Sequence, residues 1–132
     1  MSKLNVAEII QYWKKTAEHD FHTMEALFVT KQYSNSLFFG HIVLEKILKA
    51  NVVKRLKQNA PAVHNLVYLE KIAKLNLQED EKDFLGLVDE FNIRTRYPDY
   101  KLEFYKKYNN KKITEEKLLK IKELYKKLWK LL

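Results

Sequence analysis

The sequence predicts an all-α protein that forms a compact, up-and-down bundle of about five helices. The 132 residues include only two Gly and two Pro, too few for the many turns of an all-β fold. Apolar residues make up 46% and aromatics 13% of the chain, which is too rich a composition for disorder. Apolar positions recur at helical spacing along most of the chain. Because the length is typical of one domain, we expect residues 1–132 to fold as a single unit.

The first helix is predicted to begin after Asn5. Asn5 and Glu8, three residues apart, resemble a capping box, in which an Asn side chain accepts a hydrogen bond at the start of a helix. Apolar side chains then recur at every third or fourth residue from Val6 to Leu27. The first helix is therefore expected to end near Lys31.

The second helix is predicted over residues 36–57, with Asn35 as its N-cap. This segment is apolar on most sides, which is typical of a buried helix. It should therefore be the central helix of the bundle. Gly40, inside this helix, and Gly86, further along the chain, are interpreted as positions of close packing.

Three further helices complete the predicted bundle. A short helix over residues 65–75 follows a loop around Pro61, and another begins near Glu79. That helix must end near Arg96, because Pro98 has no amide hydrogen and disfavours helical geometry in the residue before it. We expect residues 97–112 to be irregular and a basic helix to begin at Thr114 and fill residues 114–132.

The formal charge of +8 lies mainly at the C-terminal end, where residues 101–132 contain eleven Lys and four Glu, a net of +7. Such an asymmetry indicates contact with nucleic acid, anionic lipid or an acidic partner. The alternative is a merely solvated basic face, because 22 of the 25 cations are Lys, a choice that AT-rich codons would favour without selection. The absence of Cys excludes disulfides and thiolate ligands and suits the cytoplasm. With no secretion signal and no long apolar run, we expect neither export nor a membrane span.

The segment FNIRTRYPDY, residues 91–100, carries two of the three arginines, Arg94 and Arg96. In a chain that otherwise uses Lys, these residues indicate a need for the planar guanidinium group, which binds carboxylate or phosphate. One reading is an anion site. The other is an internal ion pair with Glu45 of the second helix, although Glu45 and Lys49 also form a favourable pair at helical spacing.

The histidines are candidates for acid-base or metal chemistry. His19 and His22 share one face of the first helix, but no third ligand stands out, so no metal site and no cofactor are expected. His41 lies among apolar residues and reads as a hydrogen-bonded core histidine. His64 should lie at the start of the third helix, where it would anchor the loop or line a pocket.

Aromatic residues are interleaved with lysines just after the arginine segment. Aromatic rings beside cations can stack unpaired bases and hold their phosphates. The alternative reading is that these rings pack the connection onto the bundle. The aromatic residues in question are Tyr97, Tyr100, Phe104, Tyr105 and Tyr108.

Taken in order, several segments resemble the HEPN domain. They are TAEHDF with Ala17 and Asp20, SLFFGHIVLEKILKA, the element from Pro61 to Leu66, and Arg96-Tyr97-Pro98. The resemblance covers nearly the whole chain. It implies a small helical bundle that forms a homodimer with a cleft near the end of the fourth helix. It also implies a minimal nucleotidyltransferase as a partner, in two-gene modules that include toxin-antitoxin pairs.

The resemblance also raises the question of RNase activity. Active HEPN RNases use Arg, four to six arbitrary residues, and then His, but no histidine stands at these distances from Arg94 or Arg96. Imidazole suits the proton transfers of RNA cleavage near neutral pH, whereas Asp99, which stands in the place of the histidine, is a poor acid there. The chain looks like the HEPN branch that carries Arg-Tyr-Pro in this place.

The sequence therefore predicts a non-catalytic, cytoplasmic HEPN-like module that binds a nucleotide or an RNA phosphate, a nucleotidyltransferase partner, or both. The candidate ligand-binding residues are Arg94, Arg96, Tyr97, Asp99, Glu45, Lys49 and His64. Two alternatives stay open. One is a metal-independent RNase with His64 or Asp99 in the role of the missing histidine, and the other is a purely structural interaction domain whose basic C-terminal helix docks on an acidic surface.

Overall fold

The computed structural model describes the backbone of residues 5–96 and 98–132, and the side chains of residues 5–92 and 102–132. This part of the chain forms six helices and no strand, which confirms the all-α bundle. The additional helix, Pro98–Tyr108, lies in a segment that was expected to be irregular. The helices are α1 (Val6–Val29), α2 (Tyr33–Leu56), α3 (Leu66–Ala73), α4 (Glu79–Arg96), α5 (Pro98–Tyr108) and α6 (Lys111–Lys130).

The helix α2 is the centre of the bundle, as predicted. It contacts each of the other five helices, and 14 of its 24 residues are buried. Gly40 allows α6 to approach it closely, because a Cβ atom at Gly40 would lie 2.6 Å from Cδ1 of Ile121. A Cβ atom at Gly86 would meet only Val67, at 3.9 Å, so close packing does not require that glycine.

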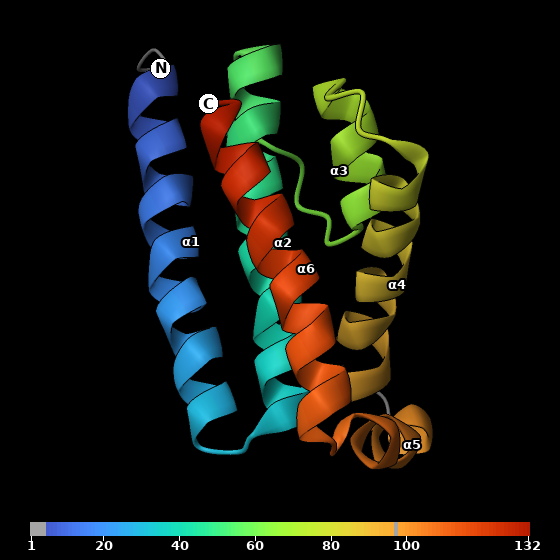
Figure 1. Cartoon of the computed structure of the whole chain (residues 1–132). Helices are drawn as coiled ribbons and strands as arrows, with labels where there is room; N and C mark the ends of the chain where they lie inside the picture. Colours follow the sequence, from blue (N-terminus) through green and yellow to red (C-terminus); the bar gives the residue numbers. More distant parts are fainter. Residues whose placement is uncertain (1–4, 97) are drawn as a thin grey trace.

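Figure 1 shows α1, α2, α4 and α6 lying alongside one another, with both chain ends at the same end of the bundle. The short helix α3 runs in the same direction as α2, so a crossing loop separates this pair and breaks the simple up-and-down order. The helix α5 lies across the opposite end of the bundle. One end is therefore formed by the C-termini of α2, α3 and α6, and the other by α5.

Local sequence signals set several helix boundaries. The side chain of Asn5 accepts a hydrogen bond from the amide of Glu8 at 3.0 Å, and that of Asn65 accepts one from Tyr68 at 2.8 Å. The prediction that Asn35 caps α2 was wrong, because α2 begins at Tyr33. The reason is tertiary: Ser36 is buried inside the helix, where its hydroxyl donates a hydrogen bond to the carbonyl of Met24 in α1 at 2.8 Å.

The expectation that residues 97–112 are irregular was also wrong. The helix α5 begins at Pro98, a residue well suited to the first turn of a helix, where an amide hydrogen would have no partner. Phe104 and Tyr108 are buried, and their rings lie 5.8 Å and 5.1 Å from that of Phe91. The packing interpretation is confirmed for these two rings, and Tyr105 is partly buried beside them. Of the other two aromatic residues, Tyr97 and the side chain of Tyr100 lie outside the described residues.

The last helix begins at Lys111, three residues earlier than predicted. Asn110 is its N-cap and accepts a hydrogen bond from the amide of Ile113 at 3.1 Å. Thr114 is buried within the helix and donates a hydrogen bond to the carbonyl of Tyr108 at 3.2 Å. The turn at Asn109-Asn110 therefore supplies the cap of this helix.

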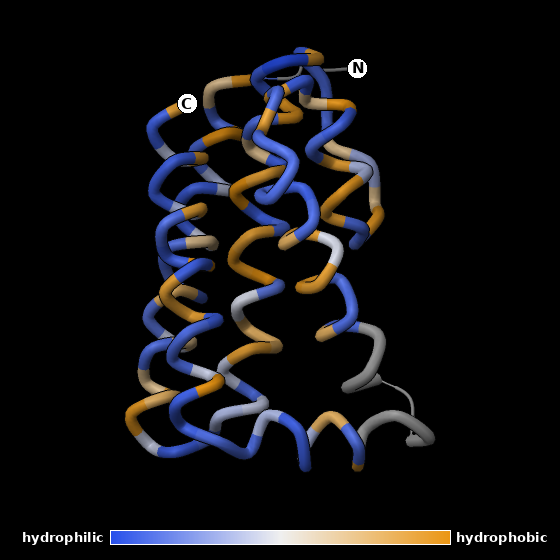
Figure 2. Tube along the Cα trace, turned by 45° about the vertical axis from the view of Figure 1, so that its right-hand side comes forward, coloured by the Kyte–Doolittle hydropathy of each residue, from blue (hydrophilic) through white to orange (hydrophobic). Residues whose placement is uncertain are grey.

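The helix α6 belongs to the core and is no appended tail. In Figure 2, hydrophobic and hydrophilic residues alternate along the helices, the colouring of amphipathic elements. On α6 the buried positions are Thr114, Leu118, Ile121, Leu124, Tyr125 and Leu128, whereas most of its lysines are exposed. Among the described residues, no helix is long and apolar enough to cross a membrane.

Candidate functional site

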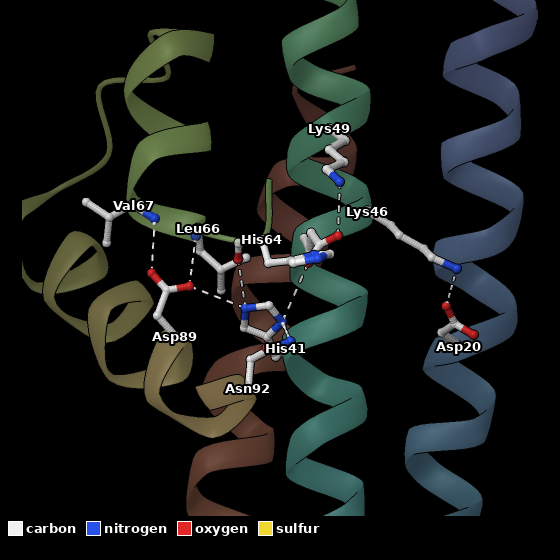
Figure 3. A network of polar contacts seen from close by, with 10 residues as sticks. Asp20, His41, Lys46, Lys49, His64, Leu66, Val67, Asp89 and Asn92 are labelled. Carbon is white, nitrogen blue, oxygen red and sulfur yellow. Dashed lines mark hydrogen bonds and ion pairs between the residues drawn. The ribbon is translucent and has the colours of Figure 1, made fainter. Parts of the chain in front are cut away.

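A pocket of about 120 Å³ opens where α2, the start of α3 and the second half of α4 meet. Figure 3 shows the polar side chains that converge there from these three elements. The pocket is lined by His41, His64, Asn65, Asp89 and Asn92.

His41 joins the three elements from inside. Its ring is fully buried, and its Nε2 atom lies 3.0 Å from the carbonyl oxygen of His64 and 3.3 Å from Oδ1 of Asp89. Since a carbonyl oxygen only accepts, Nε2 carries the hydrogen. The Nδ1 atom then accepts a hydrogen bond from Nδ2 of Asn92, at 3.3 Å. These contacts confirm the hydrogen-bonded core histidine (Figure 3).

Asp89 ties α4 to the start of α3. Its carboxylate accepts hydrogen bonds from the amides of Leu66, at 2.8 Å, and Val67, at 3.4 Å. These are the first two amides of α3, which have no partner within the helix, and a carboxylate is favourable at this positive end of the helix dipole. Asp89 therefore acts as a cap supplied by another helix.

Glu45 holds the exposed histidine of the pocket. Its Oε1 atom accepts a hydrogen bond from Nδ1 of His64 at 2.9 Å, and its Oε2 atom one from Nζ of Lys49 at 3.1 Å. Glu45 and Lys49 are only 9% and 6% exposed, and Nζ of Lys49 also lies 5.3 Å from the centre of the Trp13 ring. The pair that helical spacing predicted is therefore present, and it is buried.

His64 is the accessible member of this group. Its side chain is 57% exposed, and it directly precedes Asn65, the N-cap of α3. Its carbonyl anchors the loop on His41, and its ring lines the pocket, so both roles expected for it are observed. With Nδ1 bound to Glu45, Nε2 is left without a partner in the described part of the chain and faces the solvent side.

The structure brings together three of the candidate residues, Glu45, Lys49 and His64. Arg94 and Arg96 lie in the last turn of α4, and Arg96 follows Asn92 by four residues, about one turn of helix. The side chains of both arginines and of Asp99, and the whole of Tyr97, lie outside the described residues.

Sequence reasoning missed two pocket residues, Asp89 and Asn92. A signal was present in their spacing, because positions 89 and 92 stand four and seven residues after the apolar Leu85 and therefore share one face of the helix with it. What the sequence does not contain is the position of that face against α3 and His41.

The two histidines of α1 have separate carboxylate neighbours. His19 lies 3.5 Å from Asp20, and His22 lies 3.8 Å from Glu25. Within residues 5–92 and 102–132, no three His, Asp or Glu side chains are grouped as a metal site would require.

Two of the segments that resemble the HEPN domain, in α1 and α2, have clear structural roles. Ala17 is fully buried, and Asp20 forms an ion pair with Lys46 that links α1 to α2 (Figure 3). Comparison with curated proteins and with solved structures returned no match. The family model described as "HEPN domain" matches residues 10–131, nearly the whole chain. The chain belongs to the HEPN domain family.

Proposed function

We propose that this HEPN domain is a non-catalytic module that binds a phosphate-bearing ligand, a nucleotide or RNA, where α4 ends beside the His64 pocket. The observation that carries the proposal is that the two acids nearest the pocket already have partners. Glu45 is engaged by Lys49 and His64, and Asp89 by two amides of α3 and by His41.

These contacts weaken the reading in which Arg94 and Arg96 serve an internal ion pair with Glu45. A buried carboxylate that is already paired and hydrogen-bonded gains little from a further cation. Each arginine guanidinium provides a forked donor set that matches phosphate oxygens. An external anion is therefore the partner that we favour.

The placement of the arginines along α4 supports the same ligand. Because one turn of helix rises by about 5.4 Å, a nucleotide is long enough to reach from the last turn of α4 to the pocket beside Asn92. There the exposed Nε2 of His64 offers a further polar contact. Glu45 and Lys49 act indirectly in this proposal, since they fix the imidazole ring.

Calorimetric titration with nucleotides and short RNAs tests this proposal. We expect the wild type to bind at least one of them, and an Arg94→Ala, Arg96→Ala variant to bind it at least about tenfold more weakly. A matched control is Lys15→Ala, Lys126→Ala, which removes two exposed positive charges from α1 and α6. If the wild type and the arginine variant bind every ligand equally weakly, the ligand proposal fails.

The partner is part of the same proposal. We propose that the module forms a homodimer and associates with a minimal nucleotidyltransferase, as the family resemblance implies. Analytical ultracentrifugation of the purified chain tests the dimer. Co-expression with the neighbouring gene product, followed by capture of a tagged copy of this chain, tests the association, and a monomer that captures nothing would contradict both.

A second candidate function is metal-independent RNA cleavage, and the Glu45–His64 contact favours it. A carboxylate that accepts from Nδ1 orients the ring and leaves Nε2 available to take or give a proton. His64 would then supply the imidazole that the segment after the arginines lacks.

This candidate is tested by incubating mixed-sequence single-stranded RNA with the protein in EDTA. Cleavage should disappear in His64→Ala and in Arg96→Ala but persist in His19→Ala, which removes an exposed histidine of α1. Absence of cleavage by the wild type, or cleavage that persists in His64→Ala, would reject His64 as the acid or base.

A further inference from the structure

A second concave region lies at the end of the bundle opposite α5, where α2, α3 and α6 end together (Figure 1). It has a volume of about 440 Å³, and we call it the basic hollow. Four of its eight lining residues are cations and none is acidic. Its lining residues are Asn51, Lys54, Arg55, Lys57, Ala73, Lys74, Leu75 and Leu131.

The wall of the basic hollow is fixed by hydrogen bonds. The buried side chain of Asn51 donates to the carbonyls of Ile47, at 2.9 Å, and Leu128, at 3.1 Å, which joins α2 to α6. Lys54 donates to the backbone oxygens of Leu131 and Leu132, at 2.7 Å and 3.2 Å. Lys54 therefore neutralises the negative end of α6.

Arg55, Lys57 and Lys74 form no ion pair with any residue in the described part of the chain. Their charges exceed what the helix ends require. Each helix C-terminus is equivalent to roughly half a negative charge, about −1.5 for three, against the four lining cations. Like charges gathered around one hollow repel each other, so an anion bound there would relieve an unfavourable field.

Two of these lysines stand where the backbone favours another residue. Lys57 and Lys74 follow the last residues of α2 and α3 with φ of 59° and 52°, in the left-handed region that usually belongs to Gly or Asn at this position. A lysine there costs stability in the free protein. Both lysines with this unfavourable backbone conformation line the basic hollow.

From this combination we propose that the basic hollow binds an oligophosphate group, that is, two or more linked phosphates. Cations that converge from separate helix ends suit a compact, multiply charged anion. Arg55, the one arginine outside the segment of residues 91–100, adds a planar guanidinium group for phosphate oxygens. No aromatic ring lines the hollow, so recognition falls on the phosphates and not on a stacked base.

The test is calorimetric titration of the full chain with inorganic tripolyphosphate, with a nucleoside triphosphate and with orthophosphate. Tripolyphosphate should bind, and orthophosphate should bind at least about tenfold more weakly because it makes fewer charged contacts. Equal affinity for tripolyphosphate and the nucleoside triphosphate would support recognition of the phosphate chain alone, and tighter binding of the nucleoside triphosphate would support recognition of a nucleotide through that chain. No binding of tripolyphosphate, or binding no tighter than that of orthophosphate, would overturn the proposal.

The two left-handed lysines allow a variant in which weaker binding is not expected to come from weaker folding. Lys57→Gly, Lys74→Gly should raise Tm, because Gly adopts this backbone readily, and should still weaken tripolyphosphate binding at least about tenfold. The matched control is Lys31→Gly, whose φ is 64° but which lies between α1 and α2, at the other end of the bundle (Figure 1). It should raise Tm and leave binding unchanged.

This site is independent of the arginines at the end of α4. In Arg96→Ala, tripolyphosphate should still bind at the basic hollow, even where binding at the end of α4 is lost. If Arg96→Ala abolishes binding and Lys57→Gly, Lys74→Gly leaves it intact, the anion binds at the end of α4. That result would overturn the basic hollow while leaving the proposed function standing.

Discussion

The surroundings of His41 and the basic hollow differ in whether their charged residues are paired. Around His41, each acid has a partner: Glu45 has Lys49 and His64, and Asp89 has His41 and two amides of α3. In the basic hollow, four cations and no acid are found among the described residues that line the wall. One region is buried within the bundle, and the other is open to solvent at its end.

The difference teaches that polar residues in this bundle serve two purposes. A buried polar group must find its partners inside the protein, because water is absent, so the His41 network joins α2, α3 and α4. An exposed cation has water as its partner, so gathering several of them costs only a modest, salt-screened repulsion. The first region is therefore expected to control folding and the second to control binding.

The largest expected effect is that of His41→Leu. It removes one hydrogen-bond partner each from the carbonyl of His64, Oδ1 of Asp89 and the side-chain amide of Asn92, so we expect a loss of about 2–4 kcal/mol in the free energy of unfolding. Urea denaturation measures it. The matched variant His22→Leu, on an exposed face of α1, should change the free energy by less than about 0.5 kcal/mol. Equal effects of the two variants would break the comparison.

Asp89→Ala should come next, with a loss of about 1–3 kcal/mol, because the first amides of α3 lose their acceptor. Asp89→Asn keeps one acceptor oxygen and should lose less. A double-mutant cycle with His41→Leu measures the coupling of the two residues. Strictly additive effects would contradict a shared network, because residues that share hydrogen bonds couple.

In the basic hollow, substitutions should increase the free energy of unfolding instead of lowering it. Lys57→Gly and Lys74→Gly should each raise the free energy of unfolding by about 1 kcal/mol, because the strain of a left-handed lysine disappears. Part of the gain should come from relief of repulsion, so it should be smaller in high salt, where charges are screened. Thermal denaturation at two salt concentrations measures both parts. A loss of stability would show that these lysines help to hold the fold.

The smallest effect concerns a third kind of charge, the half-exposed pair of Glu81 and Lys127 between α4 and α6. Burial raises the pKa of Glu81, but hydrogen bonds from Nζ of Lys127 and the amide of Gln78 outweigh it, and the pKa ends below its ordinary value of 4.5. Because the pKa is lowered by folding, the stabilisation is present above that ordinary value and is lost as the pH falls through the folded value. Glu81→Gln should flatten the fall of Tm between about pH 6 and pH 3, with a loss of no more than about 1 kcal/mol at neutral pH. An unchanged pH profile would show that the pair contributes nothing.

Local signals allowed much of the fold to be predicted from the sequence. Asn5 was predicted as a cap because its side chain reaches the amide three residues ahead, a relation that the sequence contains in full. The segment of residues 36–57 was recognised as central because it is apolar on nearly every side. The helix α5 was missed because its decisive contact, Phe104 and Tyr108 on Phe91, joins residues of separate helices.

The candidate site was predicted less completely, for the same physical reason. Glu45 and Lys49 were found because one turn of a single helix pairs them. Glu45 binds His64, and Asp89 binds the start of α3, only because of how the helices pack. No local sequence pattern predicts that packing. The lysines of the basic hollow were seen only as part of a basic composition, because their left-handed backbone is visible only in three dimensions.

The central place of α2 also has a consequence for the motions of the protein. Because α2 contacts every other helix, its amides can reach solvent only when the whole bundle opens. Hydrogen exchange should therefore be slowest for residues such as Leu44, Ile47 and Leu48, and should report there the free energy of global unfolding. The helix α5 lies across one end of the bundle and has few neighbours, so its amides should exchange by a separate, less costly opening. The end of the bundle where α4 stops at Arg96 would then adjust to a ligand while α2 keeps the rest of the bundle closed.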